Sequence, residues 1–228
     1  MRNGPRRQTS EEKPLEEDTL LAGFQEKVKR GLDLLFASIG LAVLSPLFFL
    51  VSLAILMEDG RPVLFRQERV GRNGKRFRIF KFRTMVHDAE SKGLFTHEND
   101  PRITRVGRIL RRWSIDELPQ LINVLLGQMS LVGPRPTLPY QTEKYTERQR
   151  RRLLVRPGIT GLAQAKGRNA LSWPEKIELD LQYVERMSLW LDFKIILMTI
   201  PALFKRKTLY KAPEEWEKDP IAKKEARP

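Results

Sequence analysis

The sequence predicts a mainly helical α+β fold held at a membrane, and three features of its 228 residues indicate this. Residues 34–57 carry no charge and are long enough to enter a bilayer. Residues 62–83 read as a small β-hairpin, and residues 103–113 read as a basic amphipathic helix. A chain of this length buries one sizeable core, so we expect one folded domain with a membrane attachment element.

The composition points to an anionic partner and limits the chemistry. Lys and Arg total 42 against 28 Asp and Glu, a formal charge of +14, which favours nucleic acid, anionic lipid headgroups or a phosphorylated substrate. The absence of Cys excludes disulfides, thiolate nucleophiles and Cys-type zinc sites. With only His87 and His97, any metal is expected to be a hard, oxygen-liganded ion such as Mg²⁺.

The first organised element is the apolar stretch at residues 34–57. Before it, residues 1–26 mix both charge signs with little apolar pattern, which is typical of a mobile tail. The stretch exceeds the roughly 20 residues that a helix needs to cross a bilayer core of about 30 Å. A cleaved signal peptide is the rival interpretation, but the stretch starts far from Met1 and no small-residue cleavage site follows it.

How this stretch sits in the bilayer is left open by its residues. Lys29 and Arg30 precede it and a run of cations at residues 61–83 follows it, whereas an ordinary span has one basic flank. Proline kinks a helix, and Ser45-Pro46 lies in the middle. A kinked hairpin that re-enters the same leaflet explains both flanks. A transmembrane helix with a tolerated proline is an equal alternative.

After the membrane stretch, residues 62–70 and 77–83 alternate as two strands, with a tight turn at residues 71–74 between them. The second strand carries Lys81 and Arg83, for which a solvated strand face and a functional site are equally compatible with the pattern.

The remaining elements are mostly helical. Residues 103–113 space apolar side chains among arginines, and the nearby membrane stretch makes a lipid surface the better partner than nucleic acid. Residues 188–204 are apolar but interrupted, which predicts an interfacial or core helix. Residues 208–228 are expected to form a polar tail.

The adjacent carboxylates Asp116 and Glu117 are the first candidate for chemistry. Pro119 is tolerated only in the first turn of a helix, which places the two carboxylates at the positive end of that helix. Residues 114–117 (Ser-Ile-Asp-Glu) also match a capping box. By itself the segment favours a helix cap over an active site.

The neighbourhood shifts this balance toward phosphate chemistry. Arg111 comes just before the pair, and Arg135 lies between two prolines on a loop that is either a rigid connector or a phosphate grip. A rigid guanidinium near carboxylates suits a phosphate held by Arg and a divalent ion held by carboxylate. A carboxylate can also attack phosphorus to give an acyl phosphate. Asp180 lies on an acidic helical stretch, where a solvated face is the default interpretation.

Together these segments resemble the small monotopic phosphoglycosyl transferases of bacteria, over about residues 27–207. The motifs that carry the resemblance, in family order, are Lys29-Arg30-Gly31-Leu32-Asp33, Ser45-Pro46, Lys81-Phe82-Arg83-Thr84-Met85, Asp116-Glu117-Leu118-Pro119-Gln120, Val132-Gly133-Pro134-Arg135-Pro136 and Arg156-Pro157-Gly158-Ile159-Thr160-Gly161.

The resemblance implies a monotopic fold. Residues 27–60 would form a re-entrant hairpin broken at Ser45 and Pro46, and residues 61–207 a catalytic domain with interfacial helices. That domain would lie on the cytoplasmic face of the bacterial inner membrane. A homodimer is compatible with this arrangement.

The resemblance also implies a reaction: Mg²⁺-dependent, two-step transfer of a sugar-1-phosphate from a UDP-sugar to a polyprenol phosphate such as undecaprenyl phosphate, with release of UMP. This is the first membrane step of glycoconjugate assembly. Asp116 matches the nucleophile, which forms a phosphosugar–aspartate intermediate and contacts the metal, and Glu117 matches its partner carboxylate. Further substrate- or phosphate-binding positions are expected at Lys81, Arg83, Arg111, Arg135 and Asp180.

Two other classes fit the sequence less well. A membrane-tethered nucleic-acid-binding module would use the +14 charge, but the carboxylate pair would repel nucleic-acid phosphates, so no nucleic-acid partner is expected. A non-catalytic membrane scaffold leaves unexplained why Asp116 and Glu117 lie between arginine clusters.

Overall fold

The computed structural model describes residues 14–89, 100–167 and 170–204. The predicted tail at residues 208–228 and the first 13 residues of the predicted N-terminal tail lie outside the described residues. In chain order the elements are α1 (Pro14–Asp59), β1 (Leu64–Val70), η1 (Arg72–Gly74), β2 (Arg76–Phe82), α2 (Arg105–Trp113), η3 (Ile115–Glu117), α3 (Gln120–Leu125), β3 (Ser130–Val132), α4 (Pro139–Glu143), α5 (Glu147–Arg150), η4 (Arg151–Leu154), β4 (Gly158–Thr160), α6 (Leu162–Lys166), α7 (Trp173–Glu185) and α8 (Leu189–Phe204).

Helix α1 is the long apolar element that the sequence predicts. Its part Gly23–Asp59 is long and apolar enough to cross a membrane, and only 11% of its most apolar window is buried against the rest of the chain. The core helix of a soluble protein would be mostly covered, so this surface needs an apolar environment. The helix begins at Pro14, so it includes residues that the sequence assigned to the tail at residues 1–26. Proline at a helix start loses no hydrogen bond.

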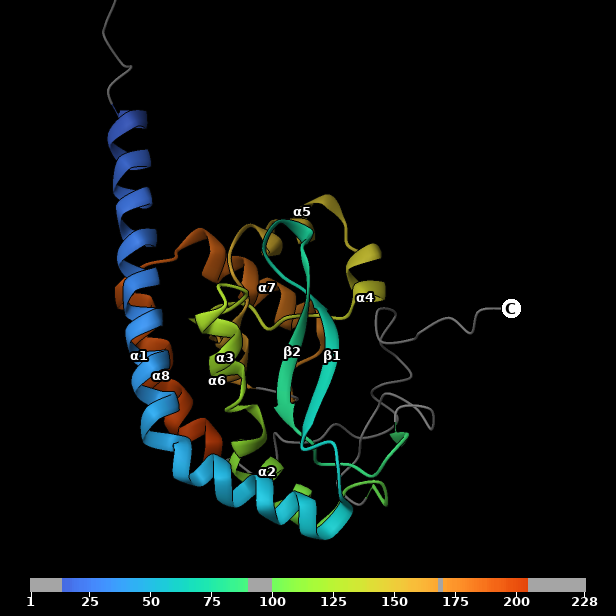
Figure 1. The fold of residues 1–228 in the computed structure, drawn as a ribbon. Coiled ribbons are helices and arrows are strands. Elements are labelled where there is room, and N and C mark those ends of the chain that lie inside the picture. The colour runs from blue at the N-terminus through green and yellow to red at the C-terminus, as the bar shows by residue number, and fades with distance from the viewer. Residues whose placement is uncertain (1–13, 90–99, 168–169, 205–228) are drawn as a thin grey trace, which may run out of the picture.

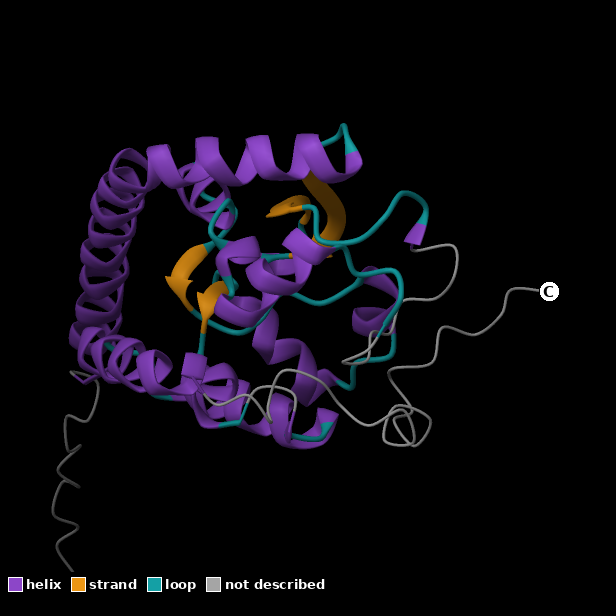
Figure 2. Ribbon diagram, turned by 90° about the horizontal axis from the view of Figure 1, so that it is seen from below, coloured by secondary structure: helices purple, strands orange, loops and turns teal. Residues whose placement is uncertain are grey.

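α1 is bent, and both of its limbs pack on the same folded body. Figures 1 and 2 show it running along two sides of the molecule, and Pro46 lies inside it. The limb before Pro46 places Ala37 in a cluster with Leu121 and Met129. The limb after Pro46 places Val51 and Ile55 in a second cluster, which contains Phe82 and Leu110.

The predicted β-hairpin is confirmed. Strands β1 and β2 pair antiparallel, from Leu64 opposite Phe82 to Val70 opposite Arg76. The turn between them contains the short helix η1, in which Asn73 has a φ of 55°. On β2, Phe77, Ile79 and Phe82 are buried, so this strand carries the core face of the hairpin.

A second, two-stranded parallel sheet joins the two glycine-containing motifs. β3 pairs with β4, Ser130 lying opposite Gly158 and Val132 opposite Thr160. A Cβ atom at Gly158 would lie 2.1 Å from the backbone nitrogen of Gly133, so neither motif tolerates a side chain at this crossing. The close approach fixes where the loop after β3 leaves the sheet.

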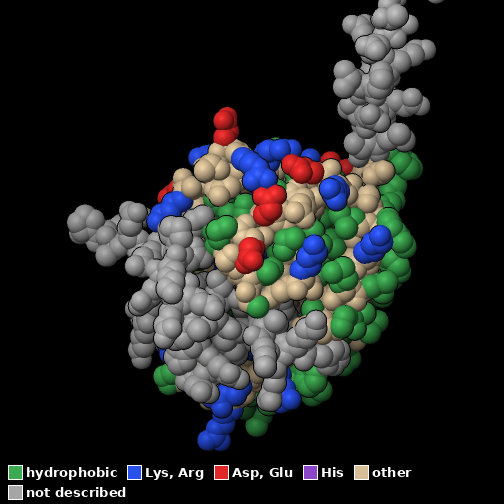
Figure 3. All heavy atoms as spheres, turned by 180° about the vertical axis from the view of Figure 1, so that it is seen from behind, with side chains coloured by type: hydrophobic (Ala, Val, Ile, Leu, Met, Phe, Trp, Pro, Cys, Tyr) green, Lys and Arg blue, Asp and Glu red, His purple; other side chains and the backbone are tan. Residues whose placement is uncertain are grey.

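α8 is the apolar C-terminal helix that residues 188–204 predict, and it is tied to α1 by polar contacts. Lys29 on α1 donates to Asp192 on α8 at 2.5 Å, and the Tyr183 hydroxyl also donates to Asp192 at 2.7 Å. The outer surface of α8 exposes large apolar side chains such as Trp190 and Phe193. Figure 3 shows hydrophobic side chains gathered along the edge that α1 and α8 form.

Candidate active site

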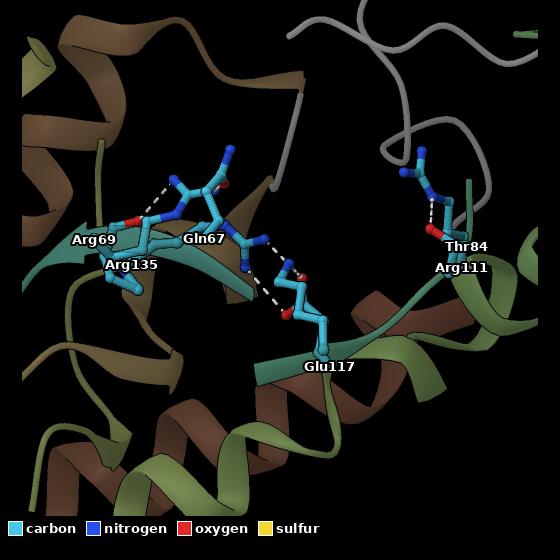
Figure 4. A network of polar contacts seen from close by, with 8 residues as sticks. Gln67, Arg69, Thr84, Arg111, Glu117 and Arg135 are labelled. Atoms are coloured by element: carbon cyan, nitrogen blue, oxygen red, sulfur yellow. Dashed lines mark hydrogen bonds and ion pairs between the residues drawn. The ribbon is translucent and has the colours of Figure 1, made fainter. Parts of the chain in front are cut away.

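Three elements bring a carboxylate and two cations together. Lys81 near the end of β2 donates to the Oε1 atom of Glu117 in η3 at 2.9 Å. Arg135, on the loop after β3, donates to both carboxylate oxygens of Glu117, at 2.6 and 3.1 Å. Figure 4 shows Glu117 and Arg135 reaching toward each other. The sequence therefore predicted three side chains that the fold places in one cluster.

The structure does not form the capping box that Ser114 and Glu117 suggested. Ser114 adopts the left-handed conformation (φ 56°, ψ 24°) between α2 and η3, and its side chain makes no capping bond. The Glu117 carboxylate, which would return to the cap in a capping box, binds Lys81 and Arg135 instead. The sequence placed Pro119 in the first turn of the following helix. In the structure Pro119 lies directly before helix α3, as its N-cap residue.

Asp116 lies beside this cluster without being bonded into it. Among the described residues no hydrogen bond to its carboxylate is found, although its neighbour Glu117 is clamped by two cations. Burial and the adjacent Glu117 charge raise the pKa of Asp116 to about 6, against the opposing effect of Lys81, Arg111 and Arg135. An unclamped carboxylate of raised pKa is a better nucleophile or base than an ordinary aspartate.

Burial and mutual contacts also shift the pKa values of the neighbouring groups. Burial raises the pKa of Glu117, but Arg135 and Lys81 outweigh it and hold that pKa well below the usual range. Burial lowers the pKa of Lys81, and Glu117 partly offsets this effect. The side chains of Lys81 and Glu117 are 15% and 19% exposed, and that of Arg135 is 45% exposed, so the clamp is open to solvent on the Arg135 side.

Arg111 approaches the cluster from α2. Its Nε atom donates to the hydroxyl of Thr84 at 2.8 Å, and its charge lowers the pKa of Asp116. No hydrogen bond joins its two terminal nitrogens to the described part of the chain, which leaves them available to an oxyanion. Figure 4 shows the pair Arg111 and Thr84 apart from Glu117 and Arg135.

Arg83 holds the end of the membrane helix rather than joining the cluster. Its terminal nitrogens donate to the backbone oxygens of Asp59, Gly60 and Arg61, at 2.8, 2.7 and 3.2 Å. The side chain of Arg83 is buried and also pairs with the Asp59 carboxylate at 3.2 Å. The predicted phosphate-binding residue thus already has a full set of protein acceptors.

Asp180 lies in a layer behind Arg135. It is 1% exposed and accepts from the Nε atom of Arg152 at 2.6 Å. Arg152 in turn donates to the backbone oxygen of Arg135 at 2.8 Å and to the Tyr145 hydroxyl. The acidic helix face expected of this region does not include Asp180, which reaches Arg135 only through Arg152.

Sequence reasoning missed two residues that position the site. Arg152 stands in a run of arginines at residues 150–152 that reads as a solvated surface, and no local signal singles it out. Thr84 was noted only as part of a motif, yet it is buried and holds Arg111. The signal available for Thr84 was its place directly after Arg83 in that motif.

The donor set of the site suits a hard metal ion that shares its ligands with the substrate. No three His, Cys, Asp or Glu side chains gather to hold a metal in the described ranges 14–89, 100–167 and 170–204. Mg²⁺ commonly takes one or two carboxylates and completes its shell with waters and substrate phosphates. Asp116 could hold such an ion, because its carboxylate is not engaged by a cation as Glu117 is.

Comparison with known proteins identifies the family. The family model described as bacterial sugar transferase matches residues 24–206. The sugar transferase EpsL of Bacillus subtilis is 47% identical over 76% of this chain and 85% of its own length. The exopolysaccharide production protein ExoY of Rhizobium meliloti is 41% identical over 77% of this chain and 84% of its own.

A longer relative carries a defined activity in its name. The UDP-glucose:undecaprenyl-phosphate glucose-1-phosphate transferase of Escherichia coli is 41% identical over 85% of this chain, but the match covers only 44% of that protein. The chain thus spans less than half the length of this relative. The predicted resemblance to phosphoglycosyl transferases is confirmed, and the chain is an enzyme that belongs to the bacterial sugar transferase family.

Proposed function

We propose that this enzyme transfers a sugar-1-phosphate from a UDP-sugar to a polyprenol phosphate and releases UMP. Relatives named as undecaprenyl-phosphate sugar phosphotransferases support the class of reaction and the acceptor. The observation that carries the proposal is the different bonding of the two adjacent carboxylates. Glu117 is clamped by Lys81 and Arg135, whereas Asp116 beside it has a raised pKa and no hydrogen-bond donor in the described residues.

In the first step, an Asp116 carboxylate oxygen attacks the phosphorus that bears the sugar. A new oxygen–phosphorus bond forms, the diphosphate bridge breaks, and UMP leaves with the bridging oxygen. The two carboxylates, Asp116 and Glu117, have different roles in this step. Glu117 fixes the guanidinium of Arg135 and the ammonium of Lys81, so that both cations lie where charge develops on the phosphate oxygens.

In the second step, a phosphate oxygen of the polyprenol phosphate attacks the same phosphorus. The bond to Asp116 breaks, the carboxylate is regenerated and the sugar-linked diphosphate lipid leaves. The free terminal nitrogens of Arg111 and the exposed side of Arg135 are suited to the acceptor and donor phosphates. A pKa of about 6 keeps Asp116 mostly ionised at neutral pH, as a nucleophile requires.

Mg²⁺ is part of the proposal, with Asp116 as its protein ligand. When bound, it would neutralise charge on the diphosphate and polarise its oxygens. Arg135 and Lys81 orient the same phosphate from the protein side whether or not the metal is present.

We also propose that α1 re-enters the membrane face from which it came, so that the catalytic domain stays on the cytoplasmic face of the bacterial inner membrane. Both ends of its apolar part are fixed to the same body, which supports this topology. At the first end, Arg30 donates to the backbone oxygen of Val124 at 2.7 Å. At the second end, Arg83 donates to the backbone of Asp59 and Gly60. A straight span would separate these two anchor points by a bilayer.

A donor screen tests the reaction. Purified protein is incubated with undecaprenyl phosphate, Mg²⁺ and each of several UDP-sugars, and UMP is measured. Without the acceptor, one donor should still release about one UMP per enzyme, because the covalent step precedes acceptor attack. Asp116→Asn should abolish both the burst and turnover, whereas Glu178→Gln, an exposed carboxylate on α7, should retain them. Normal turnover by Asp116→Asn would refute the nucleophile.

Single cysteines in this cysteine-free chain test the topology. Gln25→Cys and Lys75→Cys flank the membrane helix, and Val43→Cys lies within it as the control. In inverted membrane vesicles an impermeant thiol reagent should label both flanking positions and spare Val43→Cys. Labelling of the two flanks from opposite sides would replace the re-entrant hairpin by a transmembrane span.

A further inference from the structure

A polar cavity lies at the start of the membrane helix, away from Asp116 and Glu117. It has an empty volume of about 360 Å³, part of it open to solvent, and none of Asp116, Glu117, Lys81 and Arg135 lines it. The reaction proposed above does not use this cavity.

Cations outnumber carboxylates around the cavity. It is lined by the cations Lys29, Arg30, Arg72 and Arg156 and by the carboxylates Glu26 and Asp33. Both carboxylates are already engaged. Glu26 accepts from both terminal nitrogens of Arg72 and, at 3.1 Å, from Arg156, and Asp33 accepts the backbone N–H of Leu131 at 2.9 Å. Lys29 pairs with Asp192, so the excess positive charge of the cavity comes from its three arginines, which face only the two carboxylates of Glu26 and Asp33.

Two of the arginines converge from different elements on one spot. Arg30 of α1 donates to the backbone oxygens of Val124 and Leu125, at 2.7 and 3.2 Å. Arg156 donates from Nε to the backbone oxygen of Gly127 at 3.2 Å. Carbonyls at the end of α3 thus fix both guanidinium groups, and Arg156 also pairs with Glu26.

Unused polar atoms remain inside the cavity wall. Ser130 lines the cavity, is 0% exposed, and its hydroxyl has no partner in the described part of the chain. The Nε atom of Arg72, also buried, likewise finds no acceptor among the described residues. Buried polar atoms without partners are uncommon in folded proteins and indicate a missing ligand or water.

We propose that this cavity binds a phosphate-type oxyanion, held by Arg72 and Arg156 with the Ser130 hydroxyl as a further donor. Guanidinium groups in fixed positions suit the bidentate binding of a tetrahedral oxyanion, and the excess positive charge disfavours a metal cation. The cavity includes Lys29 and Arg30, directly before the apolar part of α1. The oxyanion is therefore either a free phosphate or the phosphate of an anionic lipid headgroup at the membrane rim.

Oxyanion binding in this cavity should affect helix α1 through Glu26. It now neutralises Arg72 and Arg156, so an incoming oxyanion adds to or competes with an acid on the membrane helix itself. Binding therefore changes the local stability of the α1 segment at residues 26–33, which hydrogen–deuterium exchange reports directly. This inference does not depend on the reaction at Asp116.

The test uses the full chain with the substitution Asp116→Asn, which excludes turnover. Hydrogen–deuterium exchange at residues 26–33 and 154–157 is compared in inorganic phosphate and in chloride of equal ionic strength. A second arm compares nanodiscs of phosphatidylglycerol with nanodiscs of phosphatidylcholine. At a phosphate concentration ten times the dissociation constant, exchange should change by about tenfold. Response to inorganic phosphate indicates a free oxyanion, and response to phosphatidylglycerol alone indicates a headgroup.

Matched variants separate binding from charge screening. Arg156→Gln should lose the response, and Ser130→Ala, which removes only an unpartnered hydroxyl, should weaken it without unfolding the chain. Arg151→Gln removes the same charge at an exposed pair with Glu185, outside the cavity, and should keep the response. Equal responses of Arg156→Gln and Arg151→Gln, or no response to either probe, would overturn the proposal.

Discussion

Two carboxylate–arginine pairs in this chain have the same contact distance and different surroundings. Glu117 meets Arg135 at 2.6 Å, and Asp180 meets Arg152 at 2.6 Å. The side chains of the first pair are 19% and 45% exposed, whereas those of the second are 1% and 3% exposed. Contact geometry alone therefore does not distinguish a reactive centre from a structural one.

The difference lies in what each arginine does with its remaining donors. Arg152 has bonds to Asp180, Tyr145 and the backbone of Arg135, and it lies over the ring of Trp173 at 5.6 Å. Within the described residues, the side chain of Arg135 donates to Glu117 alone and keeps an exposed side. The buried pair holds the loop in place, and the open pair faces the space where phosphate would bind.

Breaking the buried pair should have the largest effect, on stability. Asp180→Ala leaves the buried charge of Arg152 without its counter-ion, and we expect the free energy of unfolding to fall by about 3–5 kcal/mol. Urea denaturation followed by circular dichroism in detergent measures this. The control Glu178→Ala removes an exposed carboxylate of α7 that pairs with Arg148, and it should cost less than about 1 kcal/mol. Equal losses of unfolding free energy in Asp180→Ala and Glu178→Ala would contradict a structural role for the buried pair.

Altering the open pair should instead affect turnover. Arg135→Lys keeps the charge but loses the two-point contact with Glu117, and we expect kcat/KM for UMP release to fall about 100-fold. The unfolding transition should stay near that of the wild type, because the side chain of Arg135 is 45% exposed. Arg148→Lys, at another exposed pair, is the matched control. A large stability loss with Arg135→Lys would make the open pair structural as well.

The pH dependence of activity tests the electrostatics of the open pair. Asp116 next to the open pair has a pKa of about 6, raised by burial and Glu117. In the proposed reaction the ionised form is the nucleophile, so activity should fall about tenfold per pH unit below pH 6, reaching about one-tenth of its plateau near pH 5. Glu117→Gln removes a negative charge beside Asp116 and frees two cations, so the acid limb should move to lower pH. An acid limb that moves to higher pH in Glu117→Gln would contradict the view that the Glu117 charge raises the pKa of Asp116.

Sequence reasoning identified the residues of the open pair and, through the resemblance, Asp180, but not Arg152, which links Asp180 to Arg135. Lys81, Glu117 and Arg135 could be predicted because motif, charge and proline context point to them locally. The role of Arg152 depends on a contact between η4 and α7 across 28 positions, which no local pattern encodes. The hairpin followed from strand alternation and α8 from its apolar run, whereas the parallel pairing of β3 and β4 depends on the close approach of Gly133 and Gly158.

The variant with the smallest expected effect tests whether the position of Arg111, at the edge of the open site, matters for turnover. Thr84→Val keeps the shape of a buried side chain and removes the hydroxyl that accepts from Arg111 at 2.8 Å. A hydrogen bond to a charged group contributes about 1.5–3 kcal/mol, and at the lower end of this range kcat should fall about tenfold. Thr84→Ser restores the acceptor and should recover most of that loss. If Arg111 only supplied charge, Thr84→Val would leave kcat unchanged, since the guanidinium stays ionised in either position.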